Sequence, residues 1–515
     1  MSDNPYRWTV MIYMAGDNNL TDECVHALTQ IKEVDQLEEN KICVLAQFDP
    51  KGGRLKSHRY KLTHNREHTS LSADFKDWEN NRVEFSHPHY RDFTWWRNYT
   101  VPDVDDRFET NTGSPVTLFN FVAWCVERWP ADCYLLIISG HGGGTEKGYL
   151  LRDEHPDDAL TIWELQVALE SIRDVLGVHI DILGMDCCLM TMTEVAFQLQ
   201  GEERGRELAN FLVSSEGYSP IAGWPLKEVL ERMRNDLVRI PYPSANQRAD
   251  EERKEAERRA IARGIVEEYV NYYLDYAVGG LSVDQSALDL RVSRDVKDRI
   301  DALAIALRDE MNDRDFQRII VWSHWRAQSY NGEQFVDLYD FCAELRDECG
   351  NESKIGQACQ AVLDTQPAFA PYSCYSGPTF QYSRGVSIYF PWAEIDPNYF
   401  AVRFSRGGRG EDGQPSASEP SEWVAFLKEY IVRTRREQRD TNGPSVYGDN
   451  SYPYAARHTE GKHAPGKSML PVILSMRNPP ISAGVSECIR ERVNVERSLS
   501  QMNRIAGRPK ASRNQ

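Results

Sequence analysis

The chain has 515 residues, a hydrophobic fraction of 41% and a net charge of −18. This length and composition are typical of a large globular protein with its own apolar core. No run approaches the roughly 20 apolar residues of a membrane span, and the N-terminal sequence lacks the basic and apolar regions of a secretory signal. We therefore expect a cytoplasmic protein without membrane contact, and its acidic character does not favour nucleic-acid binding.

The 11 cysteines are scattered along the chain, apart from the neighbouring pair Cys187 and Cys188, and no CxxC spacing occurs. This pattern argues against a disulfide framework and against a zinc ribbon, and it fits a reducing compartment. We expect most of the cysteines to be small buried apolar residues.

The first half of the chain alternates short apolar runs with amphipathic patterns. Continuous apolar character predicts strands covered on both faces, at residues 8–15, 41–48, 133–139, 178–185 and 210–216. The patterns between them predict helices at 21–38, 115–129, 160–176 and 189–200. This order predicts an α/β fold with a mostly parallel sheet and right-handed crossovers.

Residues 51–112 interrupt this order and are rich in His, Trp and Tyr, so we interpret them as an inserted hairpin or lid. His87 and His89 could suggest a metal site, but two histidines alone are weak evidence and a surface loop is the simpler interpretation.

The second half is expected to hold a helical segment at 235–275, whose mixed charges over 246–263 are typical of a solvated face. The C-terminal part of the fold, 279–435, contains two predicted strands (279–290 and 383–392) and three predicted helices (about 292–311, 335–347 and 420–436). The sequence then becomes rich in Pro, Ser, Asn, Gly and Arg, which predicts a basic, mostly disordered tail over 436–515 with one short helix near 485–503.

Ligands of an open parallel sheet bind beyond the carboxyl ends of its strands. The predicted strands are followed there by thiols, carboxylates and a histidine: Asp17-Asn18-Asn19, Asp49, the Gly-rich run 140–144 with His141, Asp186-Cys187-Cys188, and Glu216. Neighbouring strands lie about 4.8 Å apart, so pairing of the two strands before His141 and Cys188 would bring a thiol within reach of a general base.

The predicted helix at 189–200 would begin directly after Cys188, and its unpaired N–H groups would favour the thiolate. Glycines after His141 would let backbone N–H groups approach an oxyanion. Three other interpretations use the same residues. A lipase-type oxyanion loop would need a GxSxG turn, a phosphate loop would need GxGxxG or GKS/T, and neither motif occurs. The third is a purely structural role for a buried cysteine and a turn histidine.

Six blocks of the sequence resemble, in order, those of the clostripain-like cysteine peptidases, which belong to the clan with the caspase-type fold. The blocks are "WTVMIYMAGDNNL", "SPVTLFNFVAWCVERWPADCYLLIISGHGGG", "IDILGMDCCLMTMTEVAFQL", "SSEGYSPIAGWP", "FVDLYDFCAEL" and "GVSIYFPW", and together they span about residues 8–430. The resemblance implies a caspase-like three-layer sandwich over residues 1–435, with a mostly parallel central sheet flanked by helices, insertions, and a C-terminal extension.

The resemblance also implies roles for individual residues. The family's His-Gly block corresponds to His141-Gly142, and its nucleophile is the last residue of an Asp-x-Cys triplet, here Cys188. Cys187 then has no required role. The N–H groups of Gly142 and Cys188 are the expected oxyanion donors. Since family members cleave after Arg or Lys, Asp186 and Glu216 are the expected acidic residues of the S1 pocket.

We therefore expect a cysteine endopeptidase that cuts peptide or protein substrates after Arg or Lys through a Cys-His dyad and a thioester acyl-enzyme. Many relatives are zymogens, which makes Arg152 the first candidate for self-cleavage and Lys147 the second, in an expected exposed loop; the charged helix near 252–263 is another. Activation by a regulatory protein partner is the alternative. No cofactor is required, and calcium enters only because some relatives need it; the sequence has no EF-hand spacing. The competing hypothesis is a non-enzymatic scaffold of the same fold that binds basic peptides or protein partners.

Overall fold

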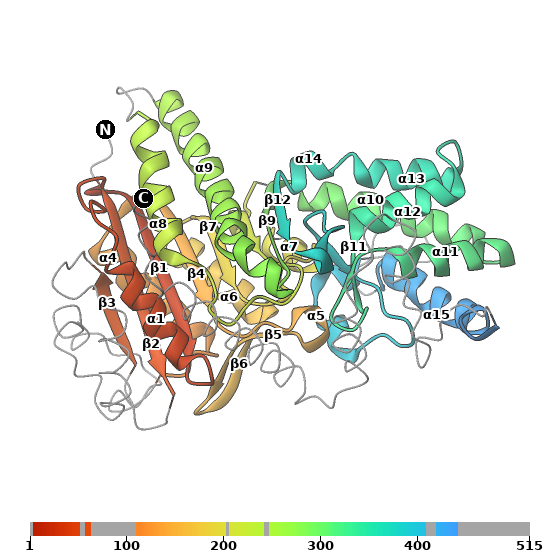
Figure 1. The fold of residues 1–515 in the computed structure, drawn as a ribbon, viewed down its shortest axis with the longest axis horizontal. Helices are drawn as coiled ribbons and strands as arrows, with labels where there is room; N and C mark the ends of the chain where they lie inside the picture. Colours follow the sequence, from red (N-terminus) through yellow and green to blue (C-terminus); the bar gives the residue numbers. More distant parts are fainter. Residues whose placement is uncertain are drawn as a thin grey trace, which may run out of the picture.

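The computed structural model describes residues 4–51, 57–62, 110–201, 205–241, 247–407 and 419–440. Eight strands form its central sheet: β1 (Tyr6–Gly16), β2 (Ile42–Pro50), β3 (His58–Leu62), β4 (Ala131–Ser139), β7 (Ile180–Asp186), β8 (Ala209–Ser214), β9 (Val283–Asp289) and β12 (Tyr372–Ser376). Their order is β12-β9-β8-β7-β4-β1-β2-β3 (Figure 1). The strands from β8 to β2 are parallel, whereas β3, β9 and β12 each pair antiparallel with their neighbours.

Helices cover both faces of this sheet. One layer consists of α1 (Thr21–Ile31), α8 (Leu226–Arg239) and α9 (Gln247–Leu274), and the other consists of α4 (Pro115–Arg128), α6 (Ile162–Leu176) and α7 (Thr193–Leu199) (Figure 1). Strand β1 shows why its central positions are continuously apolar: Val10 and Ile12 pack with the first layer, Met11 and Tyr13 with the second, and all four are fully buried. The predicted α/β three-layer fold with a mostly parallel sheet is confirmed.

A second group of helices surrounds a small antiparallel sheet at the far end of the molecule (Figure 1). The small sheet contains β10 (Ser329–Tyr330), β11 (Phe335–Asp337) and β13 (Ser387–Tyr389). The 3-10 turn η2 (Asp275–Gly279) follows α9 and does not belong to this group. The helices of the group are α10 (Ser293–Glu310), α11 (Arg314–Arg326), α12 (Leu338–Cys349), α13 (Lys354–Leu363), α14 (Gln366–Phe369) and α15 (Glu422–Asp440), with 3-10 turns η3 (Leu290–Val292), η4 (Pro378–Phe380), η5 (Pro397–Ala401) and η6 (Arg403–Ser405). This group shares one apolar core with the second helix layer of the main sheet.

The segment between β4 and α6 is not the exposed loop that the sequence suggested. It forms the short helix α5 (Gly144–Lys147) and then a hairpin of β5 (Tyr149–Glu154) and β6 (Asp157–Thr161). The two hairpin strands pair antiparallel with each other. The hairpin begins next to the His141-Gly142 turn, because Gly142 forms an isolated bridge with Leu150.

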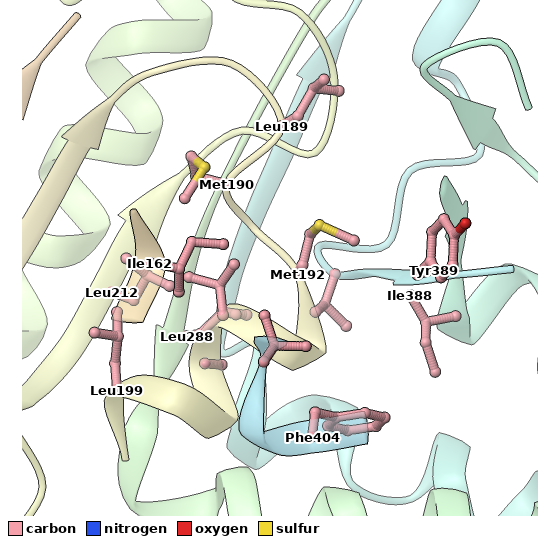
Figure 2. Packing of buried hydrophobic residues seen from close by; sticks show 14 of the residues in the cluster. Ile162, Leu189, Met190, Met192, Leu199, Leu212, Leu288, Ile388, Tyr389 and Phe404 are labelled. Carbon is pink, nitrogen blue, oxygen red and sulfur yellow. The ribbon is translucent and has the colours of Figure 1, made fainter. Parts of the chain in front are cut away.

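The predicted helix at 189–200 begins only at Thr193, so the expectation that Cys188 opens a helix is wrong. Leu189 has a φ of +63°, which cannot continue a right-handed helix. The chain then runs extended, and its backbone bonds are tertiary: the Leu189 N–H donates to the Gly217 carbonyl and the Thr191 N–H to the Ser215 carbonyl, both at 3.0 Å. Figure 2 shows the side chains of Leu189, Met190 and Met192 among the buried apolar residues.

Of the predicted insertion 51–112, residues 58–62 form the edge strand β3, whereas His87 and His89 lie outside the described residues. The tail after Asp440 lies outside them as well, and α15 continues to that residue, past the predicted boundary at 435. The predicted helical segment 235–275 corresponds to the end of α8 and to α9. None of the described helices is both long and apolar enough to cross a bilayer; the cytoplasmic location stays a prediction.

Candidate active site

Three neighbouring strands end side by side with residues that carry chemistry. The register pairs Ser139 of β4 with Asp186 of β7, and the Gly140 N–H continues the ladder by donating to the Asp186 carbonyl at 3.2 Å. His141 follows β4 and Cys188 follows β7, so the expected pairing of their two strands is present. Strand β1 pairs with the other side of β4 and is followed by Asn19.

The backbones of Gly142 and Cys188 are in direct contact. A Cβ atom on Gly142 would lie 2.4 Å from the Cys188 carbonyl oxygen and 3.1 Å from the Cys188 nitrogen. Only glycine fits this close approach. The contact brings together the two peptide groups whose N–H groups the sequence suggested as oxyanion donors.

His141 and Cys188 line one pocket, which encloses about 490 Å³ including its solvent-filled mouth. One wall comes from α1 with Glu23, and another from the segment after β8. The complete lining is Met14, Leu20, Glu23, Cys24, Ala27, Ser139, Gly140, His141, Asp186, Cys187, Cys188, Ser219, Pro220, Ile221, Ala222 and Gly223.

Asp186 gives the pocket a carboxylate in a poorly hydrated setting. Burial raises the pKa of Asp186 to about 6, while hydrogen bonds from the Ser139 hydroxyl (2.9 Å) and the Trp224 N–H oppose the shift. A Cβ atom on Gly223 would lie 2.6 Å from Asp186 Oδ2, so a larger residue there would press on the carboxylate. A cation in the pocket would favour the ionised form of Asp186.

Glu23 also lines the pocket and was missed by sequence reasoning. It lies in the first turn of α1, directly after the strand-end residues Asp17–Asn19, and is half-buried. In the sequence, only its position a few residues after the end of β1 could have suggested that Glu23 belongs to the site. Only the packing of α1 against the sheet shows that its carboxylate and that of Asp186 share a pocket.

Cys188 and Cys187 have different surroundings. The Ser219 N–H donates to Cys188 Sγ at 3.3 Å, so a loop amide, not a helix terminus, approaches this sulfur. Cys187 points into the sheet and donates to the Ile138 carbonyl at 3.7 Å. Burial, with the nearby Asp186 charge, raises the pKa of the Cys187 thiol well above its usual value. A thiol that stays protonated is a poor nucleophile, which favours Cys188.

His141 is held by an amide from β1's strand end. His141 Nε2 lies 2.8 Å from Asn19 Oδ1, and the histidine is 7% exposed. The sequence placed Asn19 at this edge of the sheet without assigning it a role.

The structure does not bring Glu216 into the pocket lining. Glu216 Oε1 accepts a hydrogen bond from the Gly385 N–H at 3.0 Å, and the Glu216 N–H donates to Asp284 at 2.6 Å. Burial, then the charges of Asp337 and Asp284, raises the pKa of Glu216 well above its usual value. The Glu216 carboxylate is thus engaged with the chain before β13, and Glu216 is absent from the pocket lining, so the expected pairing of the two acids in one pocket is corrected.

The two candidate self-cleavage residues lie in ordered backbone. Arg152 is in β5, pairs with Ala159 and accepts a hydrogen bond on its carbonyl from Asn18 Nδ2 at 2.7 Å. The expectation of an exposed loop is therefore wrong for Arg152. Lys147 ends α5 and is followed by Gly148 in the left-handed region.

Among the residues that the structure describes, no group of three or more His, Cys, Asp and Glu side chains could hold a metal ion. The acids of the 152–158 segment have protein partners instead: Asp153 accepts from Thr112, Asp157 pairs with Arg152, and Asp158 accepts from Asn111. Calcium therefore stays an expectation from the resemblance, and we derive no step through a metal.

The chain is similar in sequence and in fold to known proteins. The sequence profile of the clostripain family, the C11 peptidases, matches residues 12–406. Clostripain from Hathewaya histolytica is 24% identical in an alignment of 417 residues, with coverage of 74% of this chain and 74% of that chain. The fold is similar to that of a secreted C11 cysteine protease from Bacteroides thetaiotaomicron in complex with an irreversible peptide inhibitor, with a TM-score of 0.50, 16% identity, and coverage of 82% of this chain and 99% of that chain. An inactive zymogen C11 protease from Parabacteroides distasonis gives a TM-score of 0.48 at 18% identity, with coverage of 78% and 98%. Because the family profile spans most of the described fold and every residue of the pocket, the chain belongs to the clostripain family of C11 cysteine peptidases.

Proposed function

We propose that this peptidase cleaves peptide bonds after Arg or Lys, with Cys188 as the nucleophile and His141 as the general acid and base. The observation that carries the proposal is the shared pocket at the ends of β4 and β7, which joins an imidazole, a thiol and the Asp186 carboxylate. Both strands are central in the sheet, so the rigid core of the fold positions these groups.

The reaction follows from the positions of these groups. The Cys188 thiolate attacks the carbonyl carbon of the basic residue, and the electron pair of the C=O bond moves to oxygen, where the N–H groups of Gly142 and Cys188 stabilise it. The C–N bond breaks as His141 gives a proton to the leaving amine, which leaves a thioester. His141 then takes a proton from water, the water oxygen attacks the thioester, and the C–S bond breaks to release the acid.

Specificity for a basic side chain rests on the two carboxylates of the pocket. Asp186 lies at the end of β7, two residues before the thiol, and Glu23 faces the pocket from α1. A guanidinium can bond a buried carboxylate at two points, and an ammonium offers three donors to the same oxygens. Glu216 has no part in this proposal, because its carboxylate is engaged with Gly385.

Control by self-cleavage at Arg152 or Lys147, or by a regulatory protein partner, remains part of the proposal. Cleavage after Arg152 would require opening of the β5–β6 hairpin, whereas the bond after Lys147 lies between a short helix and a glycine turn. We therefore rank Lys147 first. Incubation of the purified protein, followed by sequencing of new N-termini, tests this order; a new N-terminus at Asp153 without one at Gly148 would reverse it.

Fluorogenic peptide amides ending in Arg, Lys or Asp test the proposed reaction. We expect turnover of the Arg and Lys amides only, loss of turnover in Cys188→Ala, and retention in the matched neighbour Cys187→Ala. Activity in Cys188→Ala, together with an inactive Cys187→Ala, would overturn the assignment of the nucleophile. Binding of basic peptides without turnover by the wild-type protein would favour the scaffold alternative.

A further inference from the structure

We infer that Asn19 is a positioning residue for His141: its side-chain oxygen holds the proton on Nε2 and leaves Nδ1 as the nitrogen that exchanges protons with Cys188 and the substrate. The inference rests on the proposed acid–base role of His141. It adds a third residue to the dyad that the sequence predicted.

The sheet order places the three residues in a row. Strands β7, β4 and β1 are adjacent and parallel, and they are followed by Cys188, His141 and Asn19 respectively. The imidazole therefore lies between a strand end that carries the thiol and a strand end that carries the amide. This arrangement lets one ring nitrogen contact Asn19, and the inference assigns the proposed proton exchange to the other.

The chemistry of the contact decides which nitrogen carries the proton. Asn19 Oδ1 lies 2.8 Å from His141 Nε2, and an amide oxygen can only accept a hydrogen bond. A neutral imidazole has one N–H group, so this bond selects the tautomer protonated at Nε2. Nδ1 is then the basic nitrogen of the neutral form.

Asn19 does not owe its position to other polar contacts of its side chain. Within the described residues its Nδ2 atom is buried without a hydrogen-bond partner. A buried donor without a partner costs stability, so such groups are uncommon and call for an explanation. The bond that Oδ1 makes to His141 offsets part of that cost.

The loop that carries Asn19 is anchored on both sides. Asn18 Nδ2 donates to the carbonyls of Ala15 (2.9 Å) and Arg152 (2.7 Å), and Asn18 Oδ1 accepts from the Leu20 N–H at 2.8 Å. The Glu154 N–H donates to the Asp17 carbonyl at 2.9 Å. The Asn19 amide is thus preorganised between the central sheet and the β5–β6 hairpin, as a positioning group requires.

The bond should also set the pH range of activity. A hydrogen bond to the charged imidazolium is stronger than one to neutral imidazole, so Asn19 favours the imidazolium that protonates the leaving amine. Activity is lost as pH rises through the pKa of His141. Asn19→Ala should therefore move the alkaline limb of kcat/KM down by about 0.7 pH unit and lower kcat about tenfold. Asn19→Asp places a negative charge beside the ring and should move the same limb up by about 1 pH unit.

The control is a second His–Asn contact of the same geometry outside the pocket. His179 Nε2 lies 2.9 Å from Asn210 Oδ1, near the opposite ends of β7 and β8. Asn210→Ala should leave kcat and both limbs of the pH profile unchanged. The rate of Cys188 alkylation by iodoacetamide against pH gives a readout that does not depend on turnover.

Shifts of opposite sign in Asn19→Ala and Asn19→Asp, in both turnover and alkylation, are the expected result. Equal losses of activity with unmoved limbs would show a structural role only and overturn the inference. If Asn19→Ala does not fold, two measurements still test the inference. One is the pH profile of Asn19→Asp. The other is the ¹⁵N chemical shifts of the wild-type His141 ring, assigned by comparison with His141→Gln, because an unprotonated Nε2 at neutral pH would refute the tautomer. Failure of the proposed function looks different: Cys188→Ala would then keep its activity, whatever the Asn19 variants do.

Discussion

Replacing Asp186 by Asn should stabilise the free enzyme at alkaline pH and at the same time remove cleavage after basic residues. Burial raises the pKa of Asp186 from 3.8 to about 6, so the folded protein ionises this group less readily than the unfolded chain does. A substrate cation favours the ionised group, but the free enzyme contains that charge without the cation. Binding and stability therefore make opposite demands on this residue.

The sign of the pH effect follows from proton linkage. The folded state holds the Asp186 proton more tightly, so stability falls as pH rises from about 4 to about 6 and stays lower above that range. A shift of about two pH units corresponds to at most about 3 kcal/mol, and the value is smaller because the residue is half-buried and faces the open pocket. Asn loses one of the two acceptor oxygens, at a cost of about 1 kcal/mol. The net gain of Asp186→Asn is then about 1–2 kcal/mol at pH 8 and absent at pH 4.

The cost in catalysis is expected to be larger. Removing one partner of a buried charge pair costs about 2–5 kcal/mol, which corresponds to a loss of about 30- to 5,000-fold in kcat/KM for Arg and Lys substrates. Turnover of substrates with a neutral residue at that position should change little. The ratio of the two activities, not the absolute rate, is the informative quantity.

Denaturant unfolding of wild type and Asp186→Asn at pH 4.5 and pH 8, with kcat/KM for basic and neutral peptide amides, tests both halves. Asp289→Asn is the matched control, since Asp289 is a buried carboxylate outside the pocket lining that pairs with Arg291 at 2.6 Å. Asp289→Asn should destabilise the protein at pH 8, because it removes one of the two carboxylates that pair with Arg291, the other being Glu255. A stability difference between wild type and Asp186→Asn that does not change with pH, or equal losses for basic and neutral substrates, would refute the reasoning.

Three further substitutions test single contacts of the site. Gly142→Ala places a Cβ atom 2.4 Å from the Cys188 carbonyl oxygen. In steady-state kinetics kcat should therefore fall about 100-fold with little change in KM. A kcat near the wild-type value would exclude this close approach of the two backbones. Glu216→Gln should keep kcat/KM for Arg and Lys substrates within about threefold of the wild-type value, which corresponds to less than about 1 kcal/mol, because the Glu216 side chain lies outside the pocket lining. A large loss confined to basic substrates would show that Glu216 binds the substrate side chain. Tyr273→Phe removes the hydrogen bond from the Tyr273 hydroxyl to the Gly223 carbonyl (2.6 Å), which contributes about 1 kcal/mol. The KM for basic substrates should therefore rise severalfold at constant kcat. An unchanged KM would show that α9 does not support this wall of the pocket.

The amino-acid sequence by itself determined the parallel sheet and the residues at its functional edge. Continuous apolar runs coincide with β1, β2, β4, β7 and β8, because strands covered on both faces need apolar side chains at every position. If the two strands before them pair directly, as β4 and β7 do, His141 and Cys188 follow neighbouring strand ends. This part of the site is encoded locally, in short segments that can be interpreted one at a time.

Only the tertiary structure decided how the surrounding chain completes the site. The pattern from Leu189 to Met192 is apolar enough for a helix, but pairing with the Ser215–Gly217 segment holds it extended. Glu216 has the right type and place in sequence for a substrate carboxylate, yet its side chain bonds to Gly385, far along the chain.

Glu23 and Asn19 come into the site for the same physical reason. Each depends on the packing of β1 and α1 against the strands that carry His141 and Cys188, and such contacts join residues far apart in the chain. No local pattern of polarity predicts these contacts, because the sequence around a half-buried polar residue after a strand is the same whether or not the residue contacts a histidine or lines a pocket. The identity of the reacting groups is therefore a property of the sequence, whereas their orientation and charge environment are properties of the folded molecule.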